Sequence, residues 1–344
     1  MPAAIPLRTS GPVQSPSNQN WAVVLAGGEG RRMRPMVKRW LGYDRPKQYC
    51  TFVGRRSMLE HTLARATQLM PPRQVVTVIG QGHSAYLNEA DTRPLPGTTI
   101  EQPEARGTLP GILLAATQVK AVHPSATLLV LPSDHFIFPE ARFLHCASVA
   151  LRRIEGFGDR ILLFGVRPEG PEPEYGWIEH GNRLGATPVS ACPLFSVRRF
   201  REKPSAEEAR VFFRSGYLCN TLMMVVKVEI LWNLAQEFFP DLHCRFETLL
   251  RVLQSVRRGE APPHYAKLAR QTIYRGMEKV DFSAALLERV ARRILVLQLH
   301  ELEWSDWGRP VRIAESLLRI GRRPLFPLEL DSRLQKSTVQ QQAG

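Results

Sequence analysis

Short apolar runs and longer amphipathic segments alternate along the first half of the chain. The apolar runs have the length and composition of buried strands, and they cover residues 21–25, 75–79, 98–100, 126–131 and 160–166. The amphipathic segments have the spacing of helices and cover residues 57–70, 109–122 and 139–154. Strands that alternate with helices are typical of a parallel sheet with helices on both faces. The pattern therefore predicts an α/β fold with a mostly parallel, doubly wound sheet.

The second half of the chain mixes strand and helix patterns in a less regular order. Strands are predicted over residues 175–180, 195–200, 217–226, 295–299 and 301–304, and helices over residues 205–215, 229–237, 241–256, 283–292 and 309–319. Ser205 and Glu208 form the capping-box pattern at the start of one of these helices. The sequence has no internal repeat and no sharp composition boundary. We therefore treat residues 21–330 as one catalytic domain.

The ends of the chain and its cysteines indicate the class of protein. Residues 1–20 are rich in Pro, Ser, Asn and Gln and lack the apolar region of a signal peptide, so we expect a disordered tail. Residues 331–344 form a polar C-terminal tail. No apolar run approaches the length of a membrane span, and the five cysteines lack the C-x-x-C spacing of a zinc site. These features predict a cytoplasmic protein with no membrane partner and no disulfide framework.

The charge of the chain favours anionic ligands. The 344 residues carry a formal net charge of +14, which attracts nucleotides, sugar phosphates or nucleic acid. The excess comes mostly from arginine pairs that are spread along the sequence, without a long basic run or a nucleic-acid-binding motif. The distribution indicates solvated helix faces, and we expect no nucleic-acid partner.

A glycine-rich segment follows the first apolar run. Residues 25–35 read L-A-G-G-E-G-R-R-M-R-P, and residues 44–48 read D-R-P-K-Q. Glycines let the backbone turn sharply and aim successive N–H groups at phosphate oxygens, while Arg32 and Lys47 add positive charge. The segment lacks the Gly-Lys-Ser/Thr of a P-loop, and Met33 replaces the third glycine of the dinucleotide fingerprint. The segment taken alone fits either a phosphate-binding loop or a tight turn.

Two aspartates are candidate metal ligands. Asp134 in L-P-S-D-H directly follows an apolar strand, so we expect it to open onto the same crevice as the glycine segment. Its carboxylate suits Mg²⁺, which prefers oxygen ligands, or it caps a turn. Asp306 in W-S-D-W-G either completes the metal site or bonds its own backbone in a turn. His135 is either a general base or a structural residue.

Four residues in the second half could bind a sugar phosphate. In E-K-P, Glu202 can accept hydrogen bonds from sugar hydroxyls and Lys203 can reach a phosphate, although the tripeptide also fits an ordinary surface turn. Gly176 in Y-G-W offers bare backbone to a sugar ring or forms a β-turn. Asn220 lies inside an apolar strand, so a ligand or neighbouring backbone must satisfy its amide.

The order of these motifs resembles that of the sugar-phosphate nucleotidyltransferase family, and most of all its mannose-1-phosphate guanylyltransferase branch. The motifs, from residue 25 to residue 308, are L-A-G-G-x-G-x-R-x-x-P, P-K-Q, L-P-S-D-H, E-Y-G-W-I-E, E-K-P, a strand Asn and W-S-D-x-G. The resemblance implies a Rossmann-like nucleotidyltransferase fold with a sugar-side elaboration. It also implies a reaction in which GTP and mannose 1-phosphate give GDP-mannose and pyrophosphate.

The resemblance also assigns roles to individual residues. The catalytic set is Arg32, Lys47, Asp134 and Lys203. The nucleotide-binding set is Leu25, Ala26, Gly27, Gly28, Gly30, Arg32 and Lys47. The sugar-phosphate-binding set is Gly176, Glu202, Lys203 and Asn220. The resemblance assigns Mg²⁺ to Asp134 and Asp306. A sugar phosphate is already a nucleophile at neutral pH, so this chemistry needs positioning and charge neutralisation rather than a base.

Several positions depart from the family pattern. The family usually has Thr in place of Arg31 and Gly in place of Leu222, and its R-N-T-A-P segment reads R-G-T-L-P at residues 106–110. The stretch of residues 36–45 is longer than is typical. We expect neither the C-terminal isomerase-type domain nor the β-helix of some relatives. Arg31 and Leu222 leave an alternative, a catalytically weak regulatory protein that binds a nucleotide or a nucleotide sugar. The sequence leaves the oligomeric state open, including a homo-oligomer.

Overall fold

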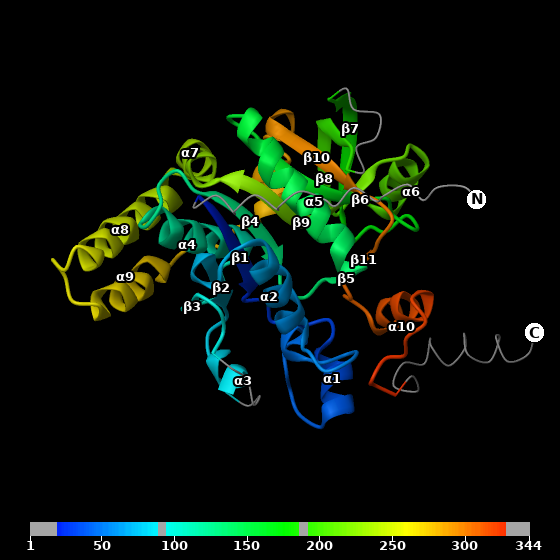
Figure 1. Cartoon of the computed structure of the whole chain (residues 1–344), viewed down its shortest axis with the longest axis horizontal. Coiled ribbons are helices and arrows are strands. Elements are labelled where there is room, and N and C mark those ends of the chain that lie inside the picture. Colours follow the sequence, from blue (N-terminus) through cyan, green and yellow to red (C-terminus); the bar gives the residue numbers. More distant parts are fainter. Residues whose placement is uncertain (1–18, 89–93, 186–191, 328–344) are drawn as a thin grey trace, which may run out of the picture.

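The computed structural model describes residues 19–88, 94–185 and 192–327. Its main sheet has nine strands in the order β3-β2-β1-β4-β9-β6-β10-β8-β7 (Figure 1). These strands are β1 (Asn20–Ala26), β2 (Val75–Ile79), β3 (Thr98–Glu101), β4 (Thr127–Pro132), β6 (Ile161–Val166), β7 (Gly176–Leu184), β8 (Leu194–Glu202), β9 (Leu218–Lys227) and β10 (Ile294–Leu299). A small second sheet pairs β5 (Phe136–Phe138) with β11 (Glu303–Ser305).

The strand directions confirm the predicted α/β class. Strands β1 to β4 pair in parallel, and so do β6 and β10. Strand β9 lies between β4 and β6 and is antiparallel to both, and β8 is antiparallel to β10 and β7. Seven strands therefore point in one direction and β8 and β9 run against them, which makes the sheet mixed.

Helices cover both faces of this sheet, which makes it doubly wound (Figure 1). They are α1 (Arg34–Leu41), α2 (Met58–Leu69), α3 (Ser84–Asn88), α4 (Thr108–Lys120), α5 (Glu140–Arg153), α6 (Ala206–Arg214), α7 (Val228–Phe238), α8 (Pro240–Arg257), α9 (His264–Tyr274) and α10 (Pro310–Arg319). Alternate strand residues point to opposite faces. Val23, Leu128 and Val130 accordingly pack with α4, α7 and α8, while Ala22 and Val24 pack with α2 and α5.

A third apolar cluster joins the segment after β1 to residues 307–326. Met33 and Val37 from the start of the chain pack with Phe52, Trp307 and Leu317. Helices α1 and α10 therefore contribute to one apolar cluster, although about 270 residues separate them in the sequence. This packing brings the W-S-D-W-G motif next to the glycine segment.

The single helix predicted over residues 283–292 is only partly confirmed. The structure has one π-helical turn at Ser283–Leu287 and one 3₁₀ turn at Ala291–Arg293. The amide of Glu288 bonds the carbonyl of Ser283, five residues back, and the Glu288 carboxylate accepts the amide of Glu202. The segment therefore ends against β8 and turns directly into β10.

Helices α1, α3 and α9 were not predicted from the sequence. Helix α1 occupies the stretch that had been treated only as a long loop, and its signals were Pro35 in the first turn and Gly42, with φ of 83°, just after the end. Helix α9 packs on α8, and the pair extends away from the sheet (Figure 1).

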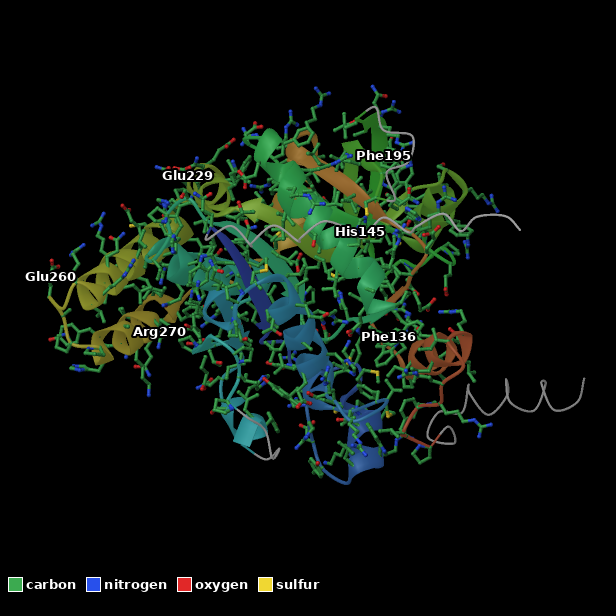
Figure 2. All side chains as sticks on the ribbon, in the orientation of Figure 1. Phe136, His145, Phe195, Glu229, Glu260 and Arg270 are labelled. Atoms are coloured by element: carbon green, nitrogen blue, oxygen red, sulfur yellow. The ribbon has the colours of Figure 1, made fainter. Side chains whose placement is uncertain are left out.

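Charged side chains extend outward from many elements rather than from one. Figure 2 shows Glu229 on α7, Glu260 after α8 and Arg270 on α9 at separate places on the surface. Among the described residues, no helix has both the length and the apolar composition that a membrane crossing requires. The predicted tails lie outside the described residues, apart from residues 19 and 20.

Two cysteines meet in the core, which their spacing in the sequence did not indicate. The Sγ atoms of Cys146 on α5 and Cys192 before β8 lie 2.6 Å apart, and both side chains are fully buried. The pair packs with the cluster that covers the α2 and α5 face.

We expect Gly165→Ala to destabilise the sheet. A Cβ at Gly165 would lie 2.8 Å from Val296 Cγ2 on β10 and 3.2 Å from Leu218 Cβ on β9. Overpacking of this kind costs about 1–3 kcal/mol of unfolding free energy. Urea unfolding measures the change, and Gly158→Ala, where a Cβ meets nothing within 4 Å, is the control. Equal stability of the two variants would contradict this account of the packing.

Candidate active site

The glycine segment turns at the carboxyl end of β1. Gly30 has a φ of +60°, a conformation that glycine adopts without strain, and a Cβ there would lie 3.1 Å from the amide nitrogen of Lys47. At Gly27, a Cβ would lie 2.4 Å from Gln102 Oε1. Both glycines are therefore needed for the close packing of this loop against its neighbours.

The P-K-Q segment fixes the shape of the glycine loop. Gln48 Nε2 donates to the carbonyl oxygens of Ala26, at 2.9 Å, and Gly28, at 2.7 Å. Gln48 is buried. Because its amide group bonds carbonyl oxygens, it does not occupy the backbone N–H groups of the loop. The motif therefore supplies a structural clamp in Gln48 beside the cation of Lys47.

A cavity of about 290 Å³ lies beside the loop. Gly28 and Asp134 both line it, which confirms that the two motifs open onto one crevice. The sequence analysis did not identify other lining residues, among them Gln102, Thr108 and Asp281. Thr108 belongs to the R-G-T-L-P segment, which corresponds to the R-N-T-A-P segment of the family. That correspondence was the sequence signal that could have placed Thr108 in the site.

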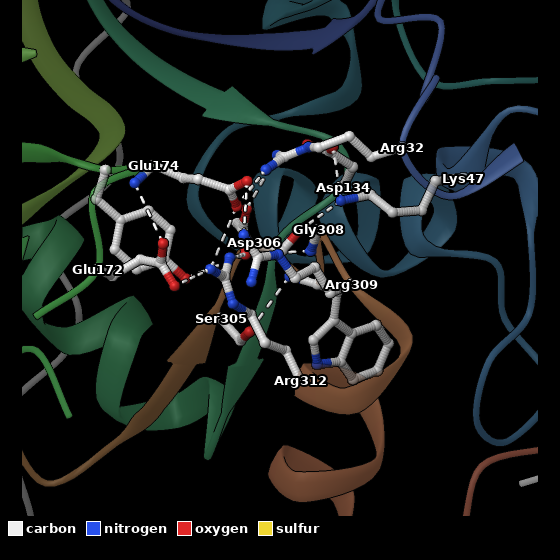
Figure 3. A network of polar contacts seen from close by, with 12 residues as sticks. Arg32, Lys47, Asp134, Glu172, Glu174, Ser305, Asp306, Gly308, Arg309 and Arg312 are labelled. Atoms are coloured by element: carbon white, nitrogen blue, oxygen red, sulfur yellow. Dashed lines mark hydrogen bonds and ion pairs between the residues drawn. The ribbon is translucent and has the colours of Figure 1, made fainter. Parts of the chain in front are cut away.

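Lys47 joins three parts of the chain. Its side chain is buried, and Nζ lies 2.9 Å from Asp134 Oδ2 (Figure 3). Nζ also donates to the backbone carbonyl of Asp306. A buried ammonium group requires such acceptors, so the glycine loop, the end of β4 and the end of β11 are held together here.

Asp306 is surrounded by hydrogen-bond donors. Its Oδ1 accepts from Arg312 Nη1 at 2.7 Å, from Tyr175 Oη at 3.1 Å and from the Gly308 amide at 3.1 Å. Its Oδ2 accepts from Arg32 Nη2 at 3.3 Å. Burial by itself raises the pKa of Asp306, but the charges of Arg312 and Lys47 outweigh it and hold the pKa well below its usual range. Asp306 is therefore ionised at neutral pH.

Asp134 and His135 differ in charge. Burial raises the pKa of Asp134, but the charge of Lys47 outweighs it and lowers the pKa overall. Burial lowers the pKa of His135 to about 4, so its imidazole is neutral near pH 7. The His135 ring also packs edge-on against Trp304, with centroids 5.3 Å apart. This environment favours the structural interpretation of His135 over a general base.

A network of arginines and glutamates continues from Asp306. Arg32 Nη1 lies 2.8 Å from Glu174 Oε2, and Arg309 Nη2 lies 2.8 Å from Glu174 Oε1 (Figure 3). Arg312 also pairs with Glu172. The sequence analysis named Arg32 but missed the other four, because pairs more than 130 residues apart leave no signal in local spacing.

The predicted sugar-side residues also meet. Gly176 pairs with Glu202 in the β7–β8 register, and a Cβ on Gly176 would lie 2.6 Å from Glu202 Oε2 and 3.3 Å from Asn220 Cβ. Lys203 Nζ lies 3.5 Å from Glu202 Oε1 and is largely exposed. Tyr175 precedes Gly176 and bonds Asp306, so it links this group to the carboxylates around Lys47.

Comparison with known proteins now places this arrangement in a family. Residues 21–316 match the family model described as Nucleotidyl transferase. The chain belongs to the nucleotidyl transferase family. The predicted resemblance and fold are therefore confirmed.

Two curated relatives of this chain carry names from sugar-nucleotide and polysaccharide biosynthesis. A mannose-1-phosphate guanylyltransferase from Klebsiella pneumoniae is 32% identical over 291 residues, which are 83% of this chain and 57% of the relative. Xanthan biosynthesis protein XanB from Xanthomonas campestris pv. campestris (strain B100) is 31% identical over 225 residues, 64% of this chain and 44% of the relative. The chain thus spans about half the length of the curated relatives it matches.

Solved structures share the fold. A structure described as mannose-1-phosphate geranyltransferase from Thermus thermophilus has a TM-score of 0.69 at 26% identity, and the match covers 88% of this chain and 79% of that one. A UDP-glucose pyrophosphorylase complexed with UDP-glucose has a TM-score of 0.53 at 14% identity over 87% and 96% of the two chains. The second match shows the fold alone.

The carboxylates of Asp134 and Asp306 could hold a divalent cation. Asp134 Oδ1 lies 3.9 Å from His135 Nε2, and Asp306 Oδ2 has the long contact with Arg32, so each carboxylate keeps one oxygen available. Within the described residues, no group of three or more His, Cys, Asp or Glu side chains could hold a metal. Two carboxylates completed by water and phosphate oxygens would suit Mg²⁺.

Glu202 should make the stability of the protein depend on pH. Burial raises its pKa from 4.5 to about 7, despite the opposing charge of Lys203. The Glu202 carboxyl ionises near pH 4.5 in the unfolded chain and near pH 7 in the folded chain. The free energy of unfolding therefore falls as pH rises through this window. We expect Glu202→Gln to remove that fall. At pH 8 its free energy of unfolding should exceed that of wild type by on the order of 3 kcal/mol.

Urea unfolding of wild type and Glu202→Gln at pH 4.5 and pH 8 measures this difference. Glu207→Gln, an exposed position on α6, is the matched control. A stability difference between Glu202→Gln and wild type that is the same at both pH values would show that burial does not raise the pKa of Glu202.

Proposed function

We propose that this protein is a Mg²⁺-dependent sugar-1-phosphate nucleotidyltransferase that converts GTP and mannose 1-phosphate to GDP-mannose and pyrophosphate. One observation carries the proposal. Lys47 lies between the carboxylate of Asp134 and the backbone of Asp306, beside the glycine loop, and Tyr175, the neighbour of Gly176, bonds Asp306. The relatives named mannose-1-phosphate guanylyltransferase support the choice of substrates.

In the proposed mechanism, residues of the chain bind the substrates and neutralise the charge of their phosphates. A phosphate oxygen of the sugar phosphate attacks the α-phosphorus of GTP, and pyrophosphate leaves in line. The glycine loop presents backbone N–H groups to the nucleotide, and Lys47 neutralises charge where the phosphates react. Arg32 exchanges its carboxylate partners for the leaving phosphates, which its largely exposed guanidinium permits. A bound Mg²⁺ would supply further neutralisation of phosphate charge at Asp134 and Asp306.

On the sugar side, Lys203 would bind the phosphate of mannose 1-phosphate. Its backbone has a φ of 45°, and its side chain extends from the end of β8 into solvent rather than into the core. Glu202 and Asn220 would contact the sugar hydroxyls, because both lie beside the bare backbone of Gly176.

The two main departures from the family pattern are compatible with activity. Arg31 Nε pairs with Glu29 Oε2 at 2.6 Å, so its charge is balanced within the loop instead of being added to the phosphate site. Leu222 has a φ of 57°, and its amide donates to Asn220 Oδ1 at 3.1 Å. The backbone therefore keeps a left-handed turn where relatives have glycine. These contacts favour an enzyme over the regulatory alternative. A cytoplasmic location and a homo-oligomer stay predictions.

Purified protein should release pyrophosphate from GTP and mannose 1-phosphate in the presence of Mg²⁺. A panel of nucleoside triphosphates and hexose 1-phosphates, followed by a coupled pyrophosphate assay, identifies the preferred pair. Release from another pair would correct the substrates, and no release from any pair would exclude the enzyme.

Asp134→Asn should lower kcat by at least about 100-fold, because it removes a charged ligand for Mg²⁺ while keeping the shape of the side chain. Asp159→Asn, at an exposed position, should keep wild-type activity. Circular dichroism checks that both variants fold. Wild-type turnover by Asp134→Asn would remove this residue from the metal site.

A further inference from the structure

Arg312 is a buried cation that none of the sequence motifs contains. It lies in the first turn of α10, and its side chain is 14% exposed. One nitrogen of its guanidinium bonds Asp306 Oδ1 at 2.7 Å, and the other pairs with Glu172 (Figure 3). The group also lies 4.8 Å from the centre of the Tyr175 ring. The planar fork of arginine can make these contacts at once, which an ammonium group cannot.

The two carboxylate oxygens of Asp306 accept different numbers of hydrogen bonds. Oδ1 receives three donors, from Arg312, Tyr175 and the amide of Gly308. Oδ2 receives one long contact, from Arg32 of the glycine loop. The carboxylate is therefore held in one rotation, with Oδ1 toward α10 and Oδ2 toward the glycine loop. A carboxylate without this restraint would turn freely and would lose orientation as a metal ligand.

The surroundings of Arg312 show why a cation is needed there. Glu172 and Glu174 both lie within salt-bridge distance of its guanidinium, together with Asp306. Without Arg312 these carboxylates would repel one another across a largely buried space. Asp306 would then be drawn toward Arg32 and Lys47, the cations that face the phosphates in the proposed function.

We propose that Arg312 is a positioning residue that orients Asp306, so that Oδ2 is presented to the divalent cation and the substrate phosphates. The inference rests on the proposed function, because that function requires Asp306 to be a metal ligand. It assigns to α10 a role in the site, since the helix carries the group that sets the orientation of the carboxylate.

Arg319 offers a matched control on the same helix. It lies two turns further along α10 and pairs with Glu303 and Glu169, so it makes the same kind of contact. No contact between Arg319 and Asp306 is present in the described structure. A role limited to holding α10 in place should make the two arginines equivalent.

The test compares Arg312→Met, Arg312→Lys and Arg319→Met by Mn²⁺ binding, with electron paramagnetic resonance as the readout and GTP present. We expect Arg312→Met to raise the Mn²⁺ dissociation constant by about 10-fold or more, the usual effect of losing a group that orients a metal ligand. Arg312→Lys should restore part of the affinity, because it returns the charge but not the fork. Arg319→Met should bind Mn²⁺ like wild type.

Steady-state assays complete the comparison. For Arg312→Met, the Mg²⁺ concentration that gives half-maximal rate should rise, and excess Mg²⁺ should recover part of kcat. Wild-type Mn²⁺ affinity in Arg312→Met, or an equal loss in Arg319→Met, would overturn the proposal. If Arg312→Met does not fold, Tyr175→Phe removes another donor to Oδ1 without changing charge and should shift Mn²⁺ affinity in the same direction; an unchanged affinity would again overturn it.

The metal readout separates the two proposals. A wild-type protein that binds Mn²⁺ but turns over no substrate pair would exclude the proposed function. The positioning role would then still be supported by a raised Mn²⁺ dissociation constant in Arg312→Met. A wild-type protein that turns over substrate while Arg312→Met keeps its metal affinity would retain the function and exclude the positioning role.

Discussion

The buried ammonium group of Lys47 is the contact on which the arrangement of this site depends. With 4% of its surface exposed, the side chain must find acceptors within the protein, and it finds them at Asp134 and at the backbone of Asp306. Three segments separated by more than 80 residues each are thereby fixed at one point. The same cation that satisfies a requirement of folding lies where triphosphate charge would be neutralised. Stability and the proposed chemistry therefore rest on one group.

Charge balance explains how so many ionised groups coexist in one region. Four cations face four carboxylates, and the residues are Arg32, Lys47, Arg309, Arg312, Asp134, Asp306, Glu172 and Glu174. The cations keep Asp134 and Asp306 ionised in spite of burial. A triphosphate keeps net negative charge when one divalent cation is bound, so in the proposed function its binding would compete with these carboxylates for Arg32 and the other cations. His135 is neutral, as suits a reaction that needs no base.

Local sequence patterns predicted the elements but not their assembly. Apolar runs located β1, β2 and β4 within a residue or two, and the capping box predicted at Ser205 is present as hydrogen bonds. Periodicity also predicted a helix over residues 283–292, where the Glu288 carboxylate instead bonds the amide of Glu202. Local periodicity does not show such a contact with a distant strand, nor the π-helical and 3₁₀ turns that form there. The reversed direction of β9 likewise depends on its neighbours and not on its own composition.

The sequence by itself determined which chemistry-bearing residues exist and in what order, because each motif combines residues a few positions apart. Arg32, Lys47, Asp134 and Asp306 could be named in this way, together with the α/β class of the fold. Only the tertiary structure decided that Lys47 touches both aspartate-bearing segments and that Arg312 orients Asp306. These are pairings between distant segments, and their geometry is set by the packing of α10 and the sheet. Local periodicity carries no record of such pairings, since it reflects only which face of an element is buried.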